Sequence, residues 1–498
     1  MLLSRKSGIL YPIFSFYSCQ KYDVFIGDWG NYDVIHKIRS MGFKVLQVLP
    51  INPICKVSFS PYSGNSAFGF EYSFLSIDNL IKSGLIDEEK VNDILSEFTL
   101  PEDRSKVYYA EALDFKYRVL KKAFKISFLK LKDKVEAFIF SNSWVKYFCL
   151  YNTIKELNDG KPWYEWENSL KFIENYDKLA QEIDQEKYYF HAFTQFICYN
   201  QYLSFKKYAN SMGVLILGDV PIYVSHDSAD VWANKHIFKL DSNGYPEFVA
   251  GVPPDYFSET GQLWGNPVYN WDELKKQNFK WWIDRLLFSF DIYDWVRIDH
   301  FRGLVAYWQV KYGEQTAING SWINAKPYEF FNTLLDYKPV LPVIAEDLGI
   351  ITPDVDLFRD RYGIPSMRVL QFAFSDPDNI HLPHNYTTNI VAYTGTHDNN
   401  TTKGWYRTEN PNFKMINTYF GKSIDENNIV YEFVKLLLSS PANLVIIPIQ
   451  DILELDEKYR INTPGTQVNN WIYRDNLLPT KIDEVRKKYA ELNYLYKR

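Results

Sequence analysis

The sequence predicts an α/β protein built as a (β/α)8 TIM barrel, and three observations lead to this prediction. Eight short apolar runs recur along the chain and end in glycine, proline or polar residues. Near-continuous apolar runs of this kind are typical of parallel strands that are buried on both faces. Segments with helical periodicity lie between most of the runs. The length of 498 residues suits one large barrel with insertions.

The eight predicted strands alternate with helical patterns such as those at Trp281–Phe290 and Ile429–Ser440. Because all strands of such a barrel end at one face, we expect the active site at their carboxyl ends. The predicted strands are Gly8–Ile13, Phe43–Pro50, Gly213–Pro221, Tyr293–His300, Leu341–Gly349, Met367–Phe374, Asn389–Asp398 and Asn443–Asp451.

The spacing between the predicted strands is uneven, which indicates insertions at the barrel mouth. Between the second and third strands, residues 51–212 contain two long helical patterns, at Tyr109–Phe140 and Ser143–Gly160, and predict a largely helical insertion. Residues 222–292 are rich in proline, glycine and aromatic residues and predict a loop-rich insertion. We expect residues 1–498 to form a single barrel that carries these two insertions.

Composition and charge exclude several classes of function. The 55 Lys and Arg against 61 Asp and Glu give a net charge of -6, which argues against a nucleic-acid partner. The four cysteines have neither zinc-site nor disulfide spacing, so we expect reduced thiols and a cytoplasmic protein. No run of about 20 apolar residues predicts a membrane span, and the N-terminal segment lacks the features of a signal peptide.

Four predicted strands end in, or lead promptly to, an acidic residue. These acids are Asp219, Asp299, Glu346 and Asp398. A single such acid is most simply explained by pairing with a nearby arginine. Four acids at one barrel mouth repel one another, so their presence together favours a catalytic role.

Asp299 is the candidate nucleophile. On a strand, Arg297 and Asp299 share one face while Val296 and Ile298 face the other way. The charged pair can therefore line the mouth while the apolar pair packs against helices. A neighbouring guanidinium lowers the pKa of a carboxylate and favours the ionised form that a nucleophile needs.

Glu346 is the candidate general acid, and its neighbour Asp347 is expected to cap the next helix. Asp398 has two interpretations. It could satisfy backbone amides in a turn. With His397 and His300 at the same mouth, we favour a set of groups that bind hydroxyls.

The loop Gly251–Pro267 is punctuated by glycine and proline and carries Tyr256, Phe257 and Trp264. Aromatic residues in such a loop ordinarily anchor it by packing. Above a mouth lined by carboxylates they would serve equally as a platform for a sugar chain, and we favour that interpretation slightly. No phosphate-binding glycine motif is present, and the pair His381 and His384 lies in a proline loop that is unsuited to a metal.

Several longer motifs identify the chain as similar to the 4-α-glucanotransferases, also called amylomaltases or disproportionating enzymes. The motifs are RIDHFRG, AEDLG, TGTHDN, GDVPIYVSHDSADVW, GVPPDYFSETGQLWGNP, GKPWYEWE and INTPGT. The resemblance implies a single catalytic (β/α)8 barrel of the α-amylase superfamily, without a separate C-terminal β-sandwich domain. It also implies transfer of a segment of a 1,4-α-glucan to the 4-hydroxyl of an acceptor, by a retaining mechanism and with neither metal nor organic cofactor. The expected partners are maltooligosaccharides and 1,4-α-glucans, and the expected state is a monomer or a weak homodimer.

The resemblance also implies roles for individual residues. Asp299 would be the nucleophile, Glu346 the general acid and base, and Asp398 the acid that stabilises the transition state. Further substrate contacts are implied for Tyr62, Asp219, Asp255, Gln262, Trp264, Arg297, His300 and His397.

Three positions depart from the family pattern, and two other functions stay open. Phe59 stands where an aspartate is usual, Ser366 where a glycine is usual, and Ile461 where a methionine is common. A hydrolase could use the same acids, because spacing in the sequence does not decide whether water or a sugar reaches the intermediate. A glucan-binding protein without turnover is disfavoured by the presence of all three acids.

Overall fold

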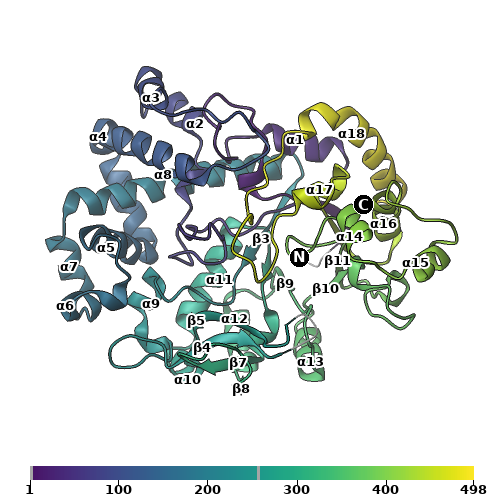
Figure 1. The fold of residues 1–498 in the computed structure, drawn as a ribbon. Coiled ribbons are helices and arrows are strands. Elements are labelled where there is room, and N and C mark those ends of the chain that lie inside the picture. Colours follow the sequence, from purple (N-terminus) through teal and green to yellow (C-terminus); the bar gives the residue numbers. More distant parts are fainter. Residues whose placement is uncertain (1–3, 255–257) are drawn as a thin grey trace.

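The computed structural model describes residues 4–254 and 258–498, and its centre is a closed barrel of eight parallel strands (Figure 1). Each of the eight predicted runs overlaps one of these strands, so the predicted (β/α)8 barrel is confirmed. Neighbours follow chain order, and β1 pairs with β12 to close the ring. The strands are β1 (Lys6–Leu10), β2 (Val45–Gln47), β3 (Leu215–Val220), β6 (Trp295–Ile298), β9 (Val343–Ala345), β10 (Ser366–Val369), β11 (Ile390–Tyr393) and β12 (Leu444–Pro448).

Helices surround the barrel and bury their apolar sides against it. In α16 the buried residues are Val430, Phe433, Val434 and Leu437, which recur at helical spacing. This spacing of apolar residues is the pattern that predicted the helix from the sequence. The predicted helix at 281–290 is α11. The helices of this group are α1 (Asp33–Ser40), α11 (Lys280–Ile292), α12 (Pro327–Tyr337), α13 (Pro353–Arg361), α14 (Thr402–Thr408), α15 (Phe413–Phe420), α16 (Ile429–Ser439), α17 (Ile449–Ile452) and α18 (Leu478–Leu495).

Between β2 and β3 the chain forms a mainly helical segment that lies to one side of the barrel (Figure 1). The two long helical patterns in the sequence correspond to α4 and α5, and both pack against α8. The helices here are α2 (Ile77–Lys82), α3 (Glu88–Leu95), α4 (Tyr109–Ser141), α5 (Ser143–Leu157), α6 (Asn168–Lys171), α7 (Tyr176–Glu182) and α8 (Gln185–Ser211).

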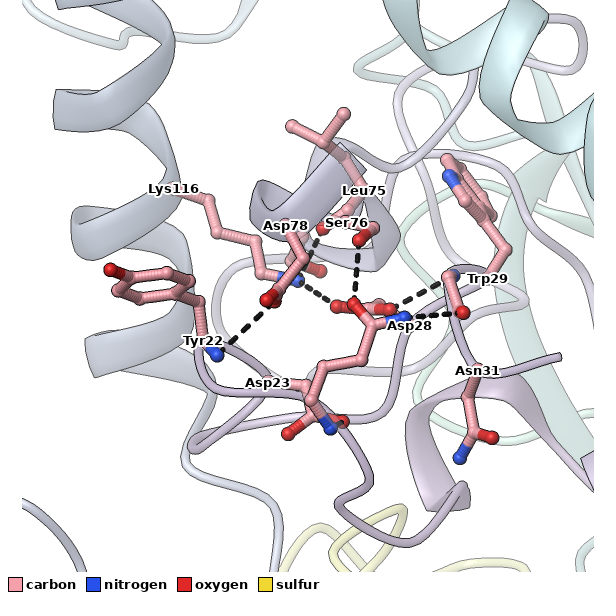
Figure 2. Close-up of polar contacts among 12 residues, drawn as sticks. Tyr22, Asp23, Asp28, Trp29, Asn31, Leu75, Ser76, Asp78 and Lys116 are labelled. Carbon is pink, nitrogen blue, oxygen red and sulfur yellow. Dashed lines mark hydrogen bonds and ion pairs between the residues drawn. The ribbon is translucent and has the colours of Figure 1, made fainter. Parts of the chain in front are cut away.

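A buried ion pair ties α4 to the loop that precedes α1 (Figure 2). Lys116 of α4 donates to Asp28 Oδ2 at 3.3 Å and to the carbonyl of Leu75 at 2.6 Å. The other oxygen of Asp28 accepts the amide of Gly30 at 2.9 Å. Burial raises the pKa of Asp28 and lowers that of Lys116, and in each case the partner's charge opposes the shift.

A second, antiparallel sheet lies outside the barrel and has the order β5-β4-β7-β8. Its strands are β4 (Phe248–Val252), β5 (Gln262–Pro267), β7 (Ala306–Lys311) and β8 (Gly320–Asn324). Two of them fall within residues 222–292, which we expected to be loop-rich. The same segment contains α9 (Ala229–Ala233), α10 (Trp271–Lys276) and α11. The sequence did not indicate this sheet, because its central strands β4 and β7 lie more than fifty residues apart in the chain.

Short 3-10 helices connect the larger elements: η1 (Ile13–Ser15), η2 (Tyr72–Phe74), η3 (Trp163–Glu165), η4 (Lys235–Ile237), η5 (Phe301–Leu304), η6 (Leu370–Phe372), η7 (Pro383–Asn385) and η8 (Glu457–Tyr459). Within residues 4–254 and 258–498, no helix is long and apolar enough to span a membrane. The cysteines Cys19, Cys55, Cys149 and Cys198 are all unpaired.

Candidate active site

The barrel brings the predicted acids together at the carboxyl ends of its strands. Asp219 ends β3 opposite Arg297 of the neighbouring β6. Asp299 follows β6, and Glu346 follows β9, the next strand around the barrel. The strand ladder continues into both residues, because Asp299 N donates to Val220 O at 3.0 Å and Glu346 N donates to Ile298 O at 3.1 Å.

Arg297 holds two of these acids at once. Its Nη1 donates to both carboxylate oxygens of Asp219, at 2.8 and 2.6 Å, and its Nη2 donates to Asp299 Oδ1 at 2.8 Å. The side chains of Arg297 and Asp219 are buried, whereas that of Asp299 is 31% exposed. The predicted common face of Arg297 and Asp299 is confirmed, and the free oxygen of Asp299 is open to a ligand.

Burial raises the pKa of Asp299, and this outweighs the guanidinium of Arg297, which lowers it. The negative charges of Asp219, Glu346 and Asp398 add to the rise. We predicted the effect of Arg297 correctly, but burial of Asp299 outweighs it, so the net direction of the pKa shift is opposite to the one we predicted.

Backbone amides from two loops fix the carboxylate of Glu346. Oε2 accepts the amide of His300 at 2.7 Å, and Oε1 accepts that of Leu348 at 2.9 Å. His300 adopts a left-handed backbone conformation, with φ 49°, which turns the chain sharply just after Asp299. Its amide consequently points at Glu346, so the chain that carries the first acid also orients the second.

Asp347 does not cap the next helix, contrary to our expectation. It is buried, and it accepts hydrogen bonds from Arg359 Nη1 at 2.6 Å, Ser366 Oγ at 2.6 Å and the amide of Met367 at 2.8 Å. Helix α13 begins after Thr352 instead. Ser366, which stands where the family usually has glycine, thus supplies a hydrogen bond to a buried carboxylate.

Asp398 lies in the loop after β11, and its carboxylate contacts two side chains in the described part of the chain. His397 Nε2 lies 3.2 Å from Asp398 Oδ2, and Asn462 Nδ2 donates to Asp398 Oδ1 at 2.6 Å. Burial alone would raise the pKa of Asp398, but His397, Asn462 and Arg297 outweigh it and hold the pKa well below its usual range. Burial lowers the pKa of His397, and Asp398 more than reverses that shift. The side chain of Asp398 is thus an ionised hydrogen-bond acceptor.

Asn462 was not among the predicted site residues, although it belongs to the INTPGT motif. Tyr62 reaches the site from the segment after β2. Its hydroxyl donates to Asp219 Oδ2 at 2.8 Å, and its ring stacks on His397 at 5.2 Å between centroids.

The other two departures from the family pattern, Phe59 and Ile461, make no hydrogen bond to the acids within the described residues. Phe59 has a left-handed backbone, with φ 53°, and its ring stacks on Tyr109 of α4 at 4.7 Å. An aromatic residue here thus packs the Tyr62 segment against the helical segment. Ile461 is buried, and its carbonyl accepts the amide of Trp471 at 2.7 Å.

His300 and Trp264 form the wall of the site on the side of the second sheet. Their rings meet edge to face at 4.9 Å, and Trp264 Nε1 donates to Gln262 Oε1 at 3.2 Å. Burial lowers the pKa of His300 to about 4, so its ring is neutral near pH 7. Its buried Nε2 has no partner in the described part of the chain. Asp255, Tyr256 and Phe257 of the same loop lie outside the described residues.

Known proteins resemble this chain over nearly its full length. Residues 11–478 match the 4-alpha-glucanotransferase family. A 4-alpha-glucanotransferase of Aquifex aeolicus is 43% identical, over 90% of this chain and 92% of its own length. That of Streptococcus pneumoniae is 38% identical, over 99% of this chain and 97% of its own.

Two solved structures share the arrangement. An amylomaltase from Streptococcus agalactiae, in complex with acarbose, is 33% identical with a TM-score of 0.92, covering 99% of both chains. An amylomaltase from Corynebacterium glutamicum is 17% identical with a TM-score of 0.80, covering 98% of this chain and 75% of its own, and this likeness concerns the fold alone.

Proposed function

Since the chain belongs to the 4-α-glucanotransferase family, we propose that Asp299, Glu346 and Asp398 are the groups that carry out its reaction. The enzyme transfers a segment of a 1,4-α-glucan to the 4-hydroxyl of an acceptor glucan or glucose. One observation carries the assignment. The chain bends at His300 so that Asp299, partly exposed and held by Arg297, stands beside a Glu346 whose carboxylate the His300 amide orients.

In the first step, Asp299 attacks the anomeric carbon of the donor. The glycosidic bond breaks, and Glu346 gives its proton to the leaving oxygen, so that a covalent glucosyl-enzyme and a shortened glucan result. Two carboxyl groups in this relation act as nucleophile and acid when they lie roughly 5–5.5 Å apart. Arg297 keeps Asp299 aimed at the carbon while Asp219 balances the charge of Arg297.

In the second step, Glu346 removes the proton of the acceptor's 4-hydroxyl, and that oxygen attacks the anomeric carbon. The bond to Asp299 breaks, which regenerates its carboxylate, and the anomeric carbon of the product has the same configuration as in the donor. Asp398, ionised and held by His397 and Asn462, would bind sugar hydroxyls more strongly as the ring flattens toward the oxocarbenium ion. The unpartnered Nε2 of His300 and the Tyr62 ring supply further contacts to the same sugar.

Gln262 and Trp264 are proposed to bind the acceptor side of the glucan, together with Asp255. Trp264 is 37% exposed and lies against His300, which supports a stacking surface next to the acids. We propose maltooligosaccharides and longer 1,4-α-glucans as substrates. The acarbose bound by the S. agalactiae amylomaltase, a relative of similar fold, supports this class of ligand.

The test of this function is product analysis with maltotriose. Transfer should give glucose and longer maltooligosaccharides, with little net gain in reducing ends. If reducing ends rise in step with the loss of donor, the protein acts as a hydrolase under these conditions and the assignment of an acceptor site is wrong.

The remaining proposals concern organisation. We propose one catalytic barrel over residues 1–498, with the insertions 51–212 and 222–292, and a cytoplasmic location that the four unpaired cysteines support. The protein is expected to be a monomer or a weak homodimer. Sedimentation velocity would measure this oligomeric state.

A further inference from the structure

The strand that carries Gln262 and Trp264 has little support of its own. β5 is an edge strand, and residues Gln262–Gly265 are exposed. Its pairing with β4 is interrupted by a register shift between Val249 and Gly251. An exposed edge strand with a broken ladder does not by itself hold a side chain in one place, yet the ring of Trp264 has to stay against His300.

The β7–β8 connection contacts the chain just before β5. Ala317 N donates to the carbonyl of Thr260 at 3.0 Å. Gly261, with φ 70°, lies so close that an added Cβ would be 2.9 Å from Ala317 Cβ. Trp308 of β7 in turn donates its Nε1 to the carbonyl of Ala317 at 2.9 Å. The indole therefore fixes Ala317, and Ala317 fixes the backbone of Thr260 and Gly261.

The same hairpin also contacts the catalytic segment. The rings of Trp308 and Trp322 meet at 5.3 Å and 65°. The guanidinium of Arg302 lies 4.0 Å from the centre of the Trp322 ring, and its Nη1 donates to Thr352 Oγ1 at 2.7 Å. Arg302 belongs to η5, which follows Asp299 and His300 directly. The two tryptophans thus bridge the chain before β5 and the chain that carries the nucleophile.

We propose that Trp308 is a positioning residue for the acceptor side of the site. Through Ala317 it holds Thr260 and Gly261, so that Gln262 and Trp264 stay in register with His300. The contact of Trp322 with Arg302 fixes the hairpin relative to Asp299. This inference rests on the roles proposed above for Gln262 and Trp264.

Trp308→Phe is the decisive variant. Phenylalanine keeps an aromatic ring against Val249, Val310 and Trp322 but removes the Nε1 donor. We expect the ratio of hydrolysis to transfer with maltotriose to rise about two- to tenfold, which corresponds to the loss of one hydrogen bond. The acceptor KM should rise as well. The rate of cleavage of an activated short donor and the melting temperature should change little.

The control is Tyr312→Phe, an exposed position at the end of the same hairpin, which should leave every readout as in the parent. Hydrogen–deuterium exchange supplies a measurement independent of activity. In Trp308→Phe, the amides of residues 258–266 should exchange faster while those of the barrel strands do not. An unchanged ratio and unchanged exchange, or a changed ratio that follows only a lowered melting temperature, would overturn the inference.

A double-mutant cycle with Trp264→Ala separates this inference from the proposed function. If Trp308 acts through Trp264, its substitution should have little further effect on the ratio in the Trp264→Ala background. Additive effects would show that Trp308 acts by another route. If Trp264→Ala alone leaves the ratio unchanged, the role proposed for Trp264 is wrong and the inference falls with it. If Trp264→Ala raises the ratio but Trp308→Phe does not, the hairpin inference alone fails.

Discussion

At the scale of single residues, Arg297 organises the site. It is a buried cation with two acidic partners, so one positive charge serves both Asp219 and Asp299. Removing one partner of a buried pair leaves an uncompensated charge, which is costly. Asp219 therefore has a structural task as well as a place near the sugar. The sequence showed the shared face of Arg297 and Asp299, but not that Arg297 divides its charge with Asp219 on another strand.

Asp299→Asn should abolish transfer and leave the fold intact. The amide is isosteric and can still accept from Arg297 Nη2, but it lacks the negative charge that forms the covalent bond. Turnover of maltotriose and trapping of a glucosyl-enzyme by mass spectrometry test this, with circular dichroism and the melting temperature as checks on the fold. Near-normal transfer by a folded variant would remove Asp299 from the nucleophile's role.

The raised pKa of Asp299 predicts the acid limb of the pH profile. The nucleophile acts only when ionised, so activity is lost as pH falls through its pKa. Because burial raises that pKa above the usual value for aspartate, kcat/KM should decline well above pH 4, the ordinary range for a carboxyl group. Asp398, whose pKa is held far lower, does not account for such a limb. Constant kcat/KM from pH 7 down to about pH 4 would contradict the assignment.

At the scale of elements, the sequence predicted those that are marked by patterns among neighbouring residues, but not those that depend on pairing between distant residues. The barrel strands and the helices α4, α5, α11 and α16 are marked by local patterns of apolar residues, and all were found. The second sheet was not, because its central pair joins β4 and β7, which lie more than fifty residues apart in the chain. For the same reason the sequence did not show that Ala317 and Trp308 contact the Gln262 segment, or that Asn462 reaches Asp398.

The ion pair between Lys116 and Asp28 joins α4 to the loop before α1, and it should contribute to the free energy of unfolding. Lys116→Met removes the cation and leaves Asp28 buried without compensation, which typically costs about 3–5 kcal/mol. Urea denaturation measures the loss. Lys132→Met provides the control on the same helix, because Lys132 pairs with Glu136 at the surface at 3.8 Å and such pairs contribute little.

The double variant Asp28→Asn/Lys116→Met should recover part of the loss. No recovery would show that Lys116 stabilises the protein through its hydrogen bond to the carbonyl of Leu75 and not through Asp28. The pH dependence has a definite sign. Without its cation, Asp28 has a folded-state pKa raised further above the unfolded one. The folded variant therefore keeps its proton to higher pH than the folded parent, in which the pKa of Asp28 is about 7. The stability of Lys116→Met should fall, relative to the parent, as pH rises above about 7.

At the scale of the whole molecule, segments from opposite parts of the sequence close the barrel. β1 pairs with β12 from Lys6 opposite Leu444 to Leu10 opposite Pro448, so the ring has no open strand edge. The buried Arg474 donates to the carbonyls of Phe16 and Val24, which joins the chain after the barrel to the chain after β1. The position of the catalytic acids thus depends on contacts between residues more than four hundred positions apart.

Arg498 ties the chain after α18 to the end of α16, so its loss should destabilise the whole molecule. Its buried guanidinium donates to the carbonyls of Leu437 at 3.1 Å, Leu438 at 2.9 Å and Ser440 at 2.9 Å, at the end of α16 just before β12. Arg5 also donates to the carbonyls of Leu438 and Ser440, so Arg498→Ala removes only part of their hydrogen bonding. We expect a loss of about 1–3 kcal/mol in the free energy of unfolding.

Arg498→Lys should recover only part of that loss, because an ammonium group lacks the planar fork that reaches several carbonyls at once. Lys487→Ala, at an exposed position of α18, is the control and should change stability little. Urea denaturation of the three variants, compared with maltotriose turnover at a temperature where all are folded, separates stability from catalysis. The Arg498→Ala protein should be less stable yet turn over maltotriose at nearly the parent rate. If stability is unchanged, the barrel closure does not depend on these carbonyl contacts.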